Sequence, residues 1–197
     1  MHILFNNTNI NYTKFKTIIY KKNEIVFNDN DTCSSIGLVE SGSISIKTNT
    51  YSENEFEINK INADGVFGMN LIFTNNPFYL GSGITLKETK IIFITKDELL
   101  ELFKNQTFLV NYLKLMSIQS KQIQRRIKIL SQNSIKDKIM FILYDNYLHN
   151  NSKIYSFKSK EELSKLLNCT RPSLSRELIN LQNDNIITYN RHQIILK

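Results

Sequence analysis

The sequence predicts an α+β protein in which antiparallel β structure is followed by one long helix and a small helical unit closed by a hairpin. Three observations predict this order. Short Ile- and Val-rich segments separated by turns fill the first hundred residues, a long stretch lacks Gly and Pro, and a helix–turn–helix–hairpin pattern ends the chain. With 41% hydrophobic and 22% charged residues, the 197-residue chain has the composition of one large or two small globular domains.

Short segments rich in Ile, Val, Phe and Thr predict the β structure. They are residues 16–20, 24–27, 36–40, 43–47, 55–61, 83–86 and 91–94, with turn-forming residues between them. Many short strands at near-regular spacing are typical of a closed or sandwiched antiparallel structure. Residues 96–104 then change to a helical pattern, with Leu99, Leu100 and Phe103 as the expected apolar stripe.

Residues 106–131 predict a long helix because they contain no Gly and no Pro. Apolar residues recur along it at steps of three, four and seven, with Ser120 at the one polar position of the series. The apolar members of this seam are Leu109, Leu113, Met116, Ile123, Ile127 and Leu130. A 3.5-residue repeat is the pattern of a coiled coil and favours a homodimer, although a helix packed against its own domain fits similar spacing.

Residues 131–134 interrupt the helical pattern. Ser134 is placed to cap a new helix over residues 135–148. The inward positions of that helix are Ile135, Ile139, Ile142 and Leu143. We therefore expect an N-terminal domain of residues 1–104, a dimerisation helix of residues 105–132 and a C-terminal domain of residues 133–197.

The last 45 residues predict a helix–turn–helix. A short strand over residues 154–157 precedes Ser159 and Glu162, which have the spacing of a capping box. The helix that follows is expected to bury Leu163, Leu166 and Leu167. Asn168 suits the left-handed conformation of a tight turn, and Thr170 is placed to cap the second helix.

The second helix is expected to run to about Gln182, with Pro172 in its first turn, where proline is tolerated. Two strands over residues 186–189 and 193–196 then predict a hairpin closed by Asn190-Arg191-His192. The order of elements is that of a helix–turn–helix followed by a two-stranded wing.

Steps of 100° per residue separate two faces of the second helix. Leu174, Leu178 and Leu181 cluster on one face, whereas Arg176 lies near the centre of a short polar face. Such a helix fits a DNA major groove, where Arg donates two parallel hydrogen bonds to guanine. A helical module that binds another protein through a solvated polar face is the alternative.

The net positive charge of the chain comes from its second half. Residues 1–104 contain 10 Lys and Arg against 12 Asp and Glu, whereas residues 105–197 contain 15 against 6. A basic half joined to a mildly acidic half indicates that one part contacts a polyanion, with nucleic acid ahead of a membrane surface.

Cysteine and histidine usage excludes several classes of site. Cys33 and Cys169 lie far apart, and the three histidines are scattered, which excludes a disulfide framework, a four-cysteine metal cluster and a His-rich metal enzyme. No nucleophile–base arrangement or phosphate-binding Gly loop is visible, so we expect no enzyme, metal or bound cofactor. Cys169 is expected to pack as a small apolar residue, and Cys33 is a weak candidate for a redox thiol. Without a secretory signal or an apolar span, a cytoplasmic location is expected.

Four segments in the right order make residues 15–197 resemble the Crp/Fnr family of bacterial transcription regulators. They are residues 20–27 (YKKNEIVF), 38–44 (LVESGSI), 65–68 (GVFG) and 169–178 (CTRPSLSREL). The resemblance implies an N-terminal effector β-roll, which is a jelly roll like those that bind cyclic nucleotides. It also implies a dimerisation helix and a C-terminal winged helix-turn-helix.

Two departures from the family pattern concern the ligand and the operator. Members that bind cyclic AMP hold its ribose and phosphate with a Gly-Glu pair and, later, an Arg-Ser or Arg-Thr pair. Here Gly68 is followed by Met69, and no Arg or Lys lies between Lys60 and Lys87, so we do not expect control by cyclic AMP. Pro172 stands where many members have a Glu that reads cytosine, so the operator cannot be transferred from them.

We therefore expect a homodimeric, sequence-specific regulator that binds a near-palindromic DNA operator, with RNA polymerase as a further candidate partner. The residues expected to contact DNA are Thr170, Arg171, Ser173, Ser175, Arg176, Arg191 and His192. A pocket for an unidentified small-molecule effector is expected at Phe67, Gly68, Met69, Asn70, Tyr79, Leu80, Ile123 and Gln124. The alternative is a small-molecule-binding β-barrel sensor whose helical half docks a protein partner.

Overall fold

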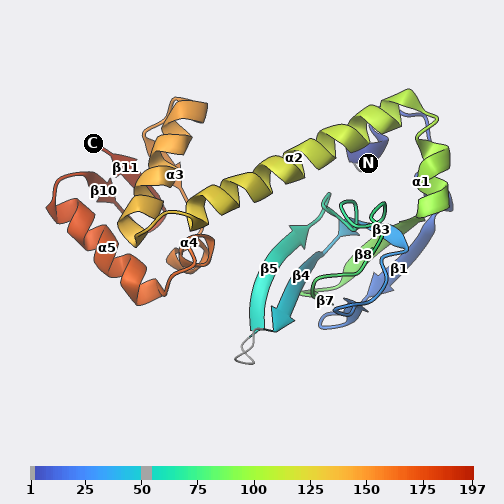
Figure 1. The fold of residues 1–197 in the computed structure, drawn as a ribbon, viewed down its shortest axis with the longest axis horizontal. Helices are drawn as coiled ribbons and strands as arrows, with labels where there is room; N and C mark the ends of the chain where they lie inside the picture. Colours follow the sequence, from blue (N-terminus) through green and yellow to red (C-terminus); the bar gives the residue numbers. More distant parts are fainter. Residues whose placement is uncertain (1–2, 50–54) are drawn as a thin grey trace. The chain divides into compact units, whose positions relative to one another are not determined.

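A computed structural model describes residues 3–49 and 55–197. The chain divides into two compact units, Met1–Ile118 and Gln119–Lys197. The division falls within the long helix α2 (Gln106–Leu130), whose first part packs with the first unit and whose last part packs with the second (Figure 1).

Two four-stranded antiparallel sheets form the first unit (Figure 1). One sheet has the order β1 (Lys16–Tyr20), β8 (Thr89–Thr95), β3 (Ser35–Ser41) and β6 (Val66–Phe67). The other has the order β2 (Ile25–Phe27), β7 (Ser82–Thr85), β4 (Ser43–Asn49) and β5 (Glu55–Asn62). Short 3-10 turns, η1 (Ile3–Phe5) and η2 (Tyr12–Lys14), precede β1. All the strands expected from the sequence form; β6 was missed because two residues carry no periodic signal.

The hairpin between β3 and β4 depends on Gly42. Its φ angle is +94°, and a Cβ added there would lie 2.5 Å from the carbonyl oxygen of Glu88. Beside it, the hydroxyl of Thr89 accepts a hydrogen bond from the backbone N–H of Ser43 at 3.1 Å and donates to the carbonyl of Lys87 at 2.8 Å. Glycine is needed here both for the backbone conformation and for the close approach of a neighbouring strand.

Helix α1 (Lys96–Leu102) closes the first unit with a reciprocal capping box between Thr95 and Glu98. Leu99 and Leu102 are buried, whereas Leu100 is 49% exposed. The expected stripe was therefore wrong at Leu100. Leu99, Leu102 and Phe103 share one helical face, whereas Leu100 is rotated by 100° from Leu99, away from the core.

The second unit contains three helices and a small sheet. Its elements after α2 are α3 (Ile135–Asn150), β9 (Ile154–Ser156), α4 (Lys160–Leu166), α5 (Arg171–Asn183), β10 (Ile187–Tyr189) and β11 (Gln193–Leu196). The sheet has three strands in the order β10-β11-β9, so the expectation of a two-stranded wing was incomplete. Strand β11 pairs along both of its edges, and Phe157 continues the second pairing by donating to the carbonyl of His192.

Side-chain caps begin the helices of the second unit, as expected. The hydroxyls of Ser134, Ser159 and Thr170 each accept a hydrogen bond from the backbone N–H three residues later. Asn168 has a φ angle of +48° in the turn between α4 and α5. Each cap satisfies a backbone donor that the first helical turn leaves unpaired. Short local segments thus specify where each helix of the helix–turn–helix begins and how the turn between α4 and α5 bends.

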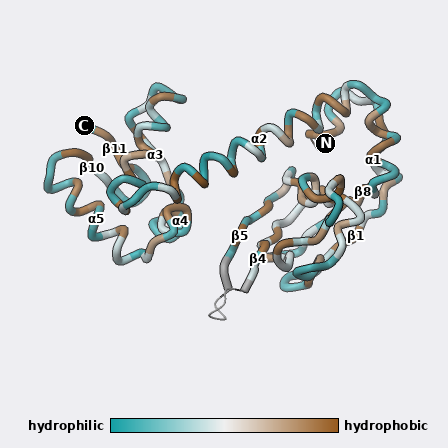
Figure 2. Tube along the Cα trace, in the orientation of Figure 1, coloured by the Kyte–Doolittle hydropathy of each residue, from teal (hydrophilic) through white to brown (hydrophobic). Residues whose placement is uncertain are grey.

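Hydrophobic and hydrophilic segments alternate along α2 and α5 in Figure 2, the pattern of amphipathic helices. Among residues 3–49 and 55–197, no helix is long and apolar enough to cross a lipid bilayer.

Candidate functional site

Helix α5 divides into a buried apolar face and an exposed polar face. Leu174, Leu178 and Leu181 have no exposed surface and pack into the core of the second unit. On the polar side, Arg176 is exposed, and no ion pair holds its guanidinium among the described residues. The leucines fix the helix on its domain while Arg176 projects into solvent, which is how a side chain that reads DNA bases must be presented.

The N-terminal turn of α5 is also organised to meet an anion. Thr170 caps it by accepting a hydrogen bond from the Ser173 backbone N–H at 3.2 Å, and its hydroxyl donates to Ser173 Oγ at 2.8 Å. Arg171 is exposed beside this cap, whereas Ser173 and Ser175 are half-buried. The remaining N–H groups of the turn and the positive end of the helix dipole favour a phosphate nearby.

The turn of the wing carries Arg191 and His192, both exposed. The side-chain oxygen of Asn190 accepts hydrogen bonds at 2.9 Å from the backbone N–H groups of His192 and Gln193, which closes the turn. His192 Nδ1 lies 3.1 Å from the carbonyl oxygen of Lys158. The turn is thus held by the Asn190 side chain and the backbone N–H groups that it accepts from, and Arg191 is exposed on it.

The second unit has a strong positive charge. Residues 119–197 contain 14 Lys and Arg against 6 Asp and Glu. Ion pairs with Lys or Arg hold some of these carboxylates, as at Arg125–Asp145, Lys136–Asp184 and Lys165–Glu161. Most of the cations are left to interact with solvent or with a polyanion.

The expected seam of α2 is largely open to solvent in the single chain. Leu113 is 54% exposed in the first unit, and Ile123 and Ile127 are 55% and 61% exposed in the second. Leu130 is also exposed, Leu109 is half-buried, and Met116 packs against the first core. Exposed branched aliphatic residues at this spacing leave an unpartnered apolar stripe, as a coiled-coil helix does without its partner.

The interior of the β-roll near the expected effector pocket is filled by aromatic rings. Tyr79 stacks on Phe27 with 3.9 Å between ring centroids, and Phe67 lies 5.2 Å from Phe27. Phe67, Gly68, Met69 and Tyr79 are all buried. Phe27 was not among the expected pocket residues, because its strand, Ile25-Val26-Phe27, is apolar throughout and carries no alternation that would show which side chain points inward.

Other expected pocket residues lie outside this aromatic cluster. Asn70 is exposed, and Leu80 is 75% exposed. Ile123 and Gln124 are exposed residues of the second unit. Sequence reasoning also missed Tyr112 of α2, whose hydroxyl donates a hydrogen bond to the carbonyl of Met69 at 3.2 Å. This bond joins the start of α2 to the segment of the expected effector pocket.

Neither cysteine has the environment of a reactive thiolate. Cys33 is 1% exposed, and its thiol donates to the carbonyl of Ser35. Burial raises the pKa of the Cys33 thiol, and it also raises the pKa of the neighbouring Tyr79 hydroxyl. A neutral, inaccessible thiol is a poor redox sensor, so the redox hypothesis for Cys33 loses its support. Cys169 packs against the second core, as expected, and burial raises its pKa as well.

Comparison with known proteins agrees with this architecture. Residues 17–106 match the family model of the cyclic nucleotide-binding domain. No curated protein sequence is significantly similar to the chain.

Solved structures align over nearly the whole chain. CprK in complex with OCPA aligns with a TM-score of 0.74 at 14% identity, covering 98% of this chain and 90% of CprK. A CooA variant from Carboxydothermus hydrogenoformans aligns with a TM-score of 0.70 at 17% identity, covering 100% of this chain and 92% of CooA. The c-di-GMP-responsive global regulator CLP from Xanthomonas campestris aligns with a TM-score of 0.62 at 19% identity, covering 94% of this chain and 95% of CLP. Residues 17–106 therefore resemble the cyclic nucleotide-binding domain family, and the whole chain has the fold of the Crp/Fnr transcription regulators, as the sequence motifs predicted.

Proposed function

We propose that this protein is a homodimeric, sequence-specific DNA-binding transcription regulator of the Crp/Fnr type, without enzymatic activity, that acts in the cytoplasm. The observation that carries the proposal is Arg176. It projects from the polar face of a helix whose other face is anchored by fully buried leucines. The fold shared with regulators such as CLP supports the same conclusion.

Helix α5 would enter the major groove with its N-terminal half. Arg176 would donate two parallel hydrogen bonds to the O6 and N7 atoms of a guanine. Thr170, Arg171 and Ser173 at the helix N-terminus would contact phosphates or base edges, with Ser175 beside them. Arg191 and His192 of the wing would position the protein on the backbone.

A homodimer would present two copies of α5 to the DNA. The seam of α2 supports this assembly, because most of its apolar side chains are exposed in the single chain. A two-fold dimer places its recognition helices about one helical turn apart, ~34 Å, so the operator is expected to be a near-palindrome. RNA polymerase is a further partner that a promoter-bound regulator would contact.

We also propose that cyclic AMP is not the effector. A buried cyclic phosphate needs a cationic partner, and residues 61–86 contain no Arg or Lys. The stacked rings of Phe27 and Tyr79 occupy the roll interior beside the ring of Phe67. Calorimetry with cyclic AMP should give no binding up to about 1 mM, a level that corresponds to about 4 kcal/mol of affinity. A micromolar dissociation constant would refute this part of the proposal.

The DNA-binding proposal is tested by in vitro selection from a random duplex pool, followed by fluorescence-anisotropy titrations. Arg176→Ala should lose about 1–3 kcal/mol on the selected operator and much less on a scrambled duplex. Arg191→Ala should weaken both duplexes equally and reduce the salt slope by about one, because it removes a phosphate contact. Lys22→Ala in the first unit removes the same charge and should change neither.

Each outcome bears on one part of the proposal. Failure to select any sequence, together with weak binding that is insensitive to salt, would favour the protein-docking sensor instead. Equal losses by Arg176→Ala on both duplexes would leave Arg176 as a phosphate contact and not as the reader of a base.

A further inference from the structure

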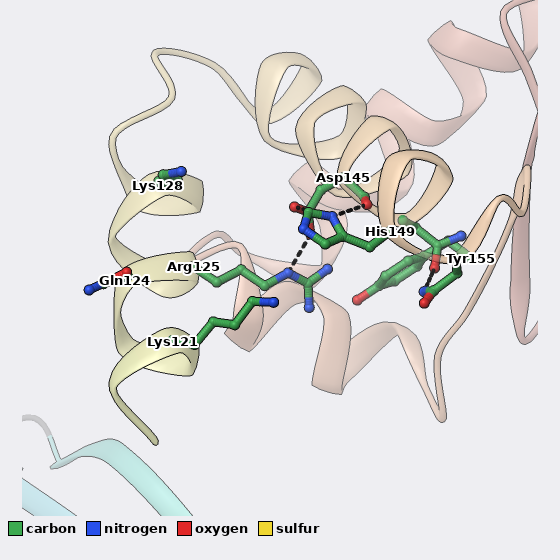
Figure 3. A pocket seen from close by; sticks show the side chains of 9 residues that line it. Lys121, Gln124, Arg125, Lys128, Asp145, His149 and Tyr155 are labelled. Carbon is green, nitrogen blue, oxygen red and sulfur yellow. Dashed lines mark hydrogen bonds and ion pairs between the residues drawn. The ribbon is translucent and has the colours of Figure 1, made fainter. Parts of the chain in front are cut away.

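The second unit contains an open pocket of about 370 Å³ that the proposed DNA-binding face does not use. Lys121, Gln124, Arg125 and Lys128 line it from one face of α2. The C-terminal half of α3 and Tyr155 of β9 form the rest, and neither α4 nor α5 contributes a residue (Figure 3). A cavity of this size is at the lower end of the range of small-molecule sites.

A carboxylate holds Arg125 in a fixed orientation within the pocket. Arg125 Nε donates to Asp145 Oδ2 at 2.6 Å, so its two terminal amino groups point away from that contact (Figure 3). His149 also faces Asp145, with 3.4 Å between Nδ1 and Oδ1. A guanidinium that is anchored through Nε keeps its paired terminal donors available for a second, bidentate partner.

The hydroxyl of Tyr155 and the ammonium group of Lys121 are two further donors beside those amino groups (Figure 3). The ring of Tyr155 packs against the core of the second unit, and its hydroxyl points towards Arg125 (Figure 3). Among the described residues, that hydroxyl makes no hydrogen bond. Burial raises the pKa of Tyr155 despite the opposing effect of Arg125, so the hydroxyl keeps its proton and remains a donor.

Lys121 extends from α2 towards Arg125, and no carboxylate pairs with it in the described part of the chain (Figure 3). Lys128 is likewise without an ion-pair partner there. Asp145 neutralises one positive charge of the lining through its ion pair with Arg125. Glu162, which is not one of the lining residues, contributes to the raised pKa of Tyr155. The lining therefore keeps a net positive charge beside an aromatic wall.

We propose that this pocket binds a small phosphate monoester, whose phosphoryl oxygens are held by Arg125, Lys121 and the hydroxyl of Tyr155. The pocket has room for an organic group as well as a phosphate, because its volume exceeds the ~150 Å³ of a cavity that holds a benzene ring. The Tyr155 ring supplies the surface for that group. A backbone phosphate of DNA is less well matched, because the pocket lies apart from α5 and its N-terminus.

Access to the pocket does not conflict with the proposed dimer. Steps of 100° place the centre of the pocket face of α2 about 130° from the centre of the seam formed by Ile123 and Ile127. The site remains open whether or not that seam pairs, so the ligand proposal is independent of the DNA-binding proposal.

The test is isothermal titration of the full-length protein with phenyl phosphate, with neutral phenol and inorganic phosphate as comparison probes. Phenyl phosphate should bind saturably below about 1 mM, inorganic phosphate more weakly, and phenol not measurably. Tyr155→Phe, which removes one oxygen, and Lys121→Gln should each weaken binding about tenfold, the loss expected for one hydrogen bond to a charged group. Lys114→Gln, an exposed change on α2 outside the pocket, should leave binding unchanged.

Three results would overturn the proposal. One is no saturation by about 10 mM phenyl phosphate, a level weaker than ~3 kcal/mol of affinity. Another is equal weakening by Lys114→Gln, which would indicate attraction to the general charge of the protein. The third is loss of duplex affinity in Lys121→Gln and Tyr155→Phe without binding of phenyl phosphate, which would assign the pocket to a DNA phosphate.

Discussion

Replacing Ile123 by alanine tests the dimer seam with the smallest chemical change. Isoleucine to alanine deletes three carbon groups, each worth about 0.8 kcal/mol when fully transferred out of water. Ile123 is 55% exposed in the single chain, so pairing would bury roughly half of that value. The expected loss is about 1.3 kcal/mol per chain and about 2.5 kcal/mol per dimer, which raises the dissociation constant about 70-fold.

Ile118→Ala is the matched control for this change. Ile118 lies on the same helix and is 50% exposed, but five helical steps place it about 140° from Ile123 around the axis. It should change the dissociation constant less than about threefold. Sedimentation equilibrium over a range of concentrations measures all three proteins. Equal shifts for the two variants, or a wild type that is monomeric at micromolar concentration, would refute the assignment of the seam.

Three further predictions concern the stability of each unit. Leu178→Ala, at a side chain with no exposed surface on α5, should lower the free energy of unfolding by about 2–5 kcal/mol in urea titrations; a loss below about 1 kcal/mol would mean that α5 is not anchored by its leucines. Gly42→Ala should cost at least about 1–3 kcal/mol, because φ is +94° and the Glu88 carbonyl blocks a Cβ; an unchanged midpoint would contradict this turn geometry. Burial raises the pKa of Tyr112 to about 12, with a smaller contribution from Cys33, so the folded state holds this proton more tightly than the unfolded chain. The contribution of Tyr112 to the free energy of unfolding is fully present below about pH 10. It decreases between about pH 10 and 12, by at most ~1.4 kcal/mol per pH unit. Tyr112→Phe should flatten that slope in urea titrations at alkaline pH, and an unchanged slope would show that other groups cause it.

Much of the fold follows from patterns that lie within a few residues of one another. The caps at Ser134, Ser159 and Thr170 and the left-handed turn at Asn168 formed as the sequence predicted. Each depends on a hydrogen bond or a backbone conformation that one short segment specifies by itself. The buried leucine face of α5 likewise follows from helical periodicity alone.

The proposed DNA-contacting residues were accessible to sequence reasoning for the same reason. Arg176 and the leucines opposite it lie on one helix, so their relative directions are fixed by a 100° step. The exposure of the helix N-terminus follows from the Thr170 cap and the turn before it. These are local properties, and the fit of such a helix to a DNA major groove follows from them without any family resemblance.

The interior of the roll required the tertiary structure. Phe27, Phe67 and Tyr79 are separated by up to 52 residues in the sequence, and their stacking depends on how the two sheets face each other. No periodicity reports such a distance. The pairing of β9 with β11 and the burial of Leu102 in place of Leu100 have the same origin, because a packing partner selects among edges and faces that look equivalent in the sequence.

By itself, the sequence determined the order of the elements, the caps and turns, the polar face of α5 and the apolar series along α2, because each depends on neighbours within about one or two helical turns. Only the tertiary structure decided that aromatic rings fill the roll and that Cys33 is inaccessible. It alone also brought Arg125, Asp145 and Tyr155 together from two helices and a strand into a charged pocket. The physical reason is that burial and desolvation depend on contacts between distant segments, which determine whether a charged or aromatic side chain is free to bind a ligand.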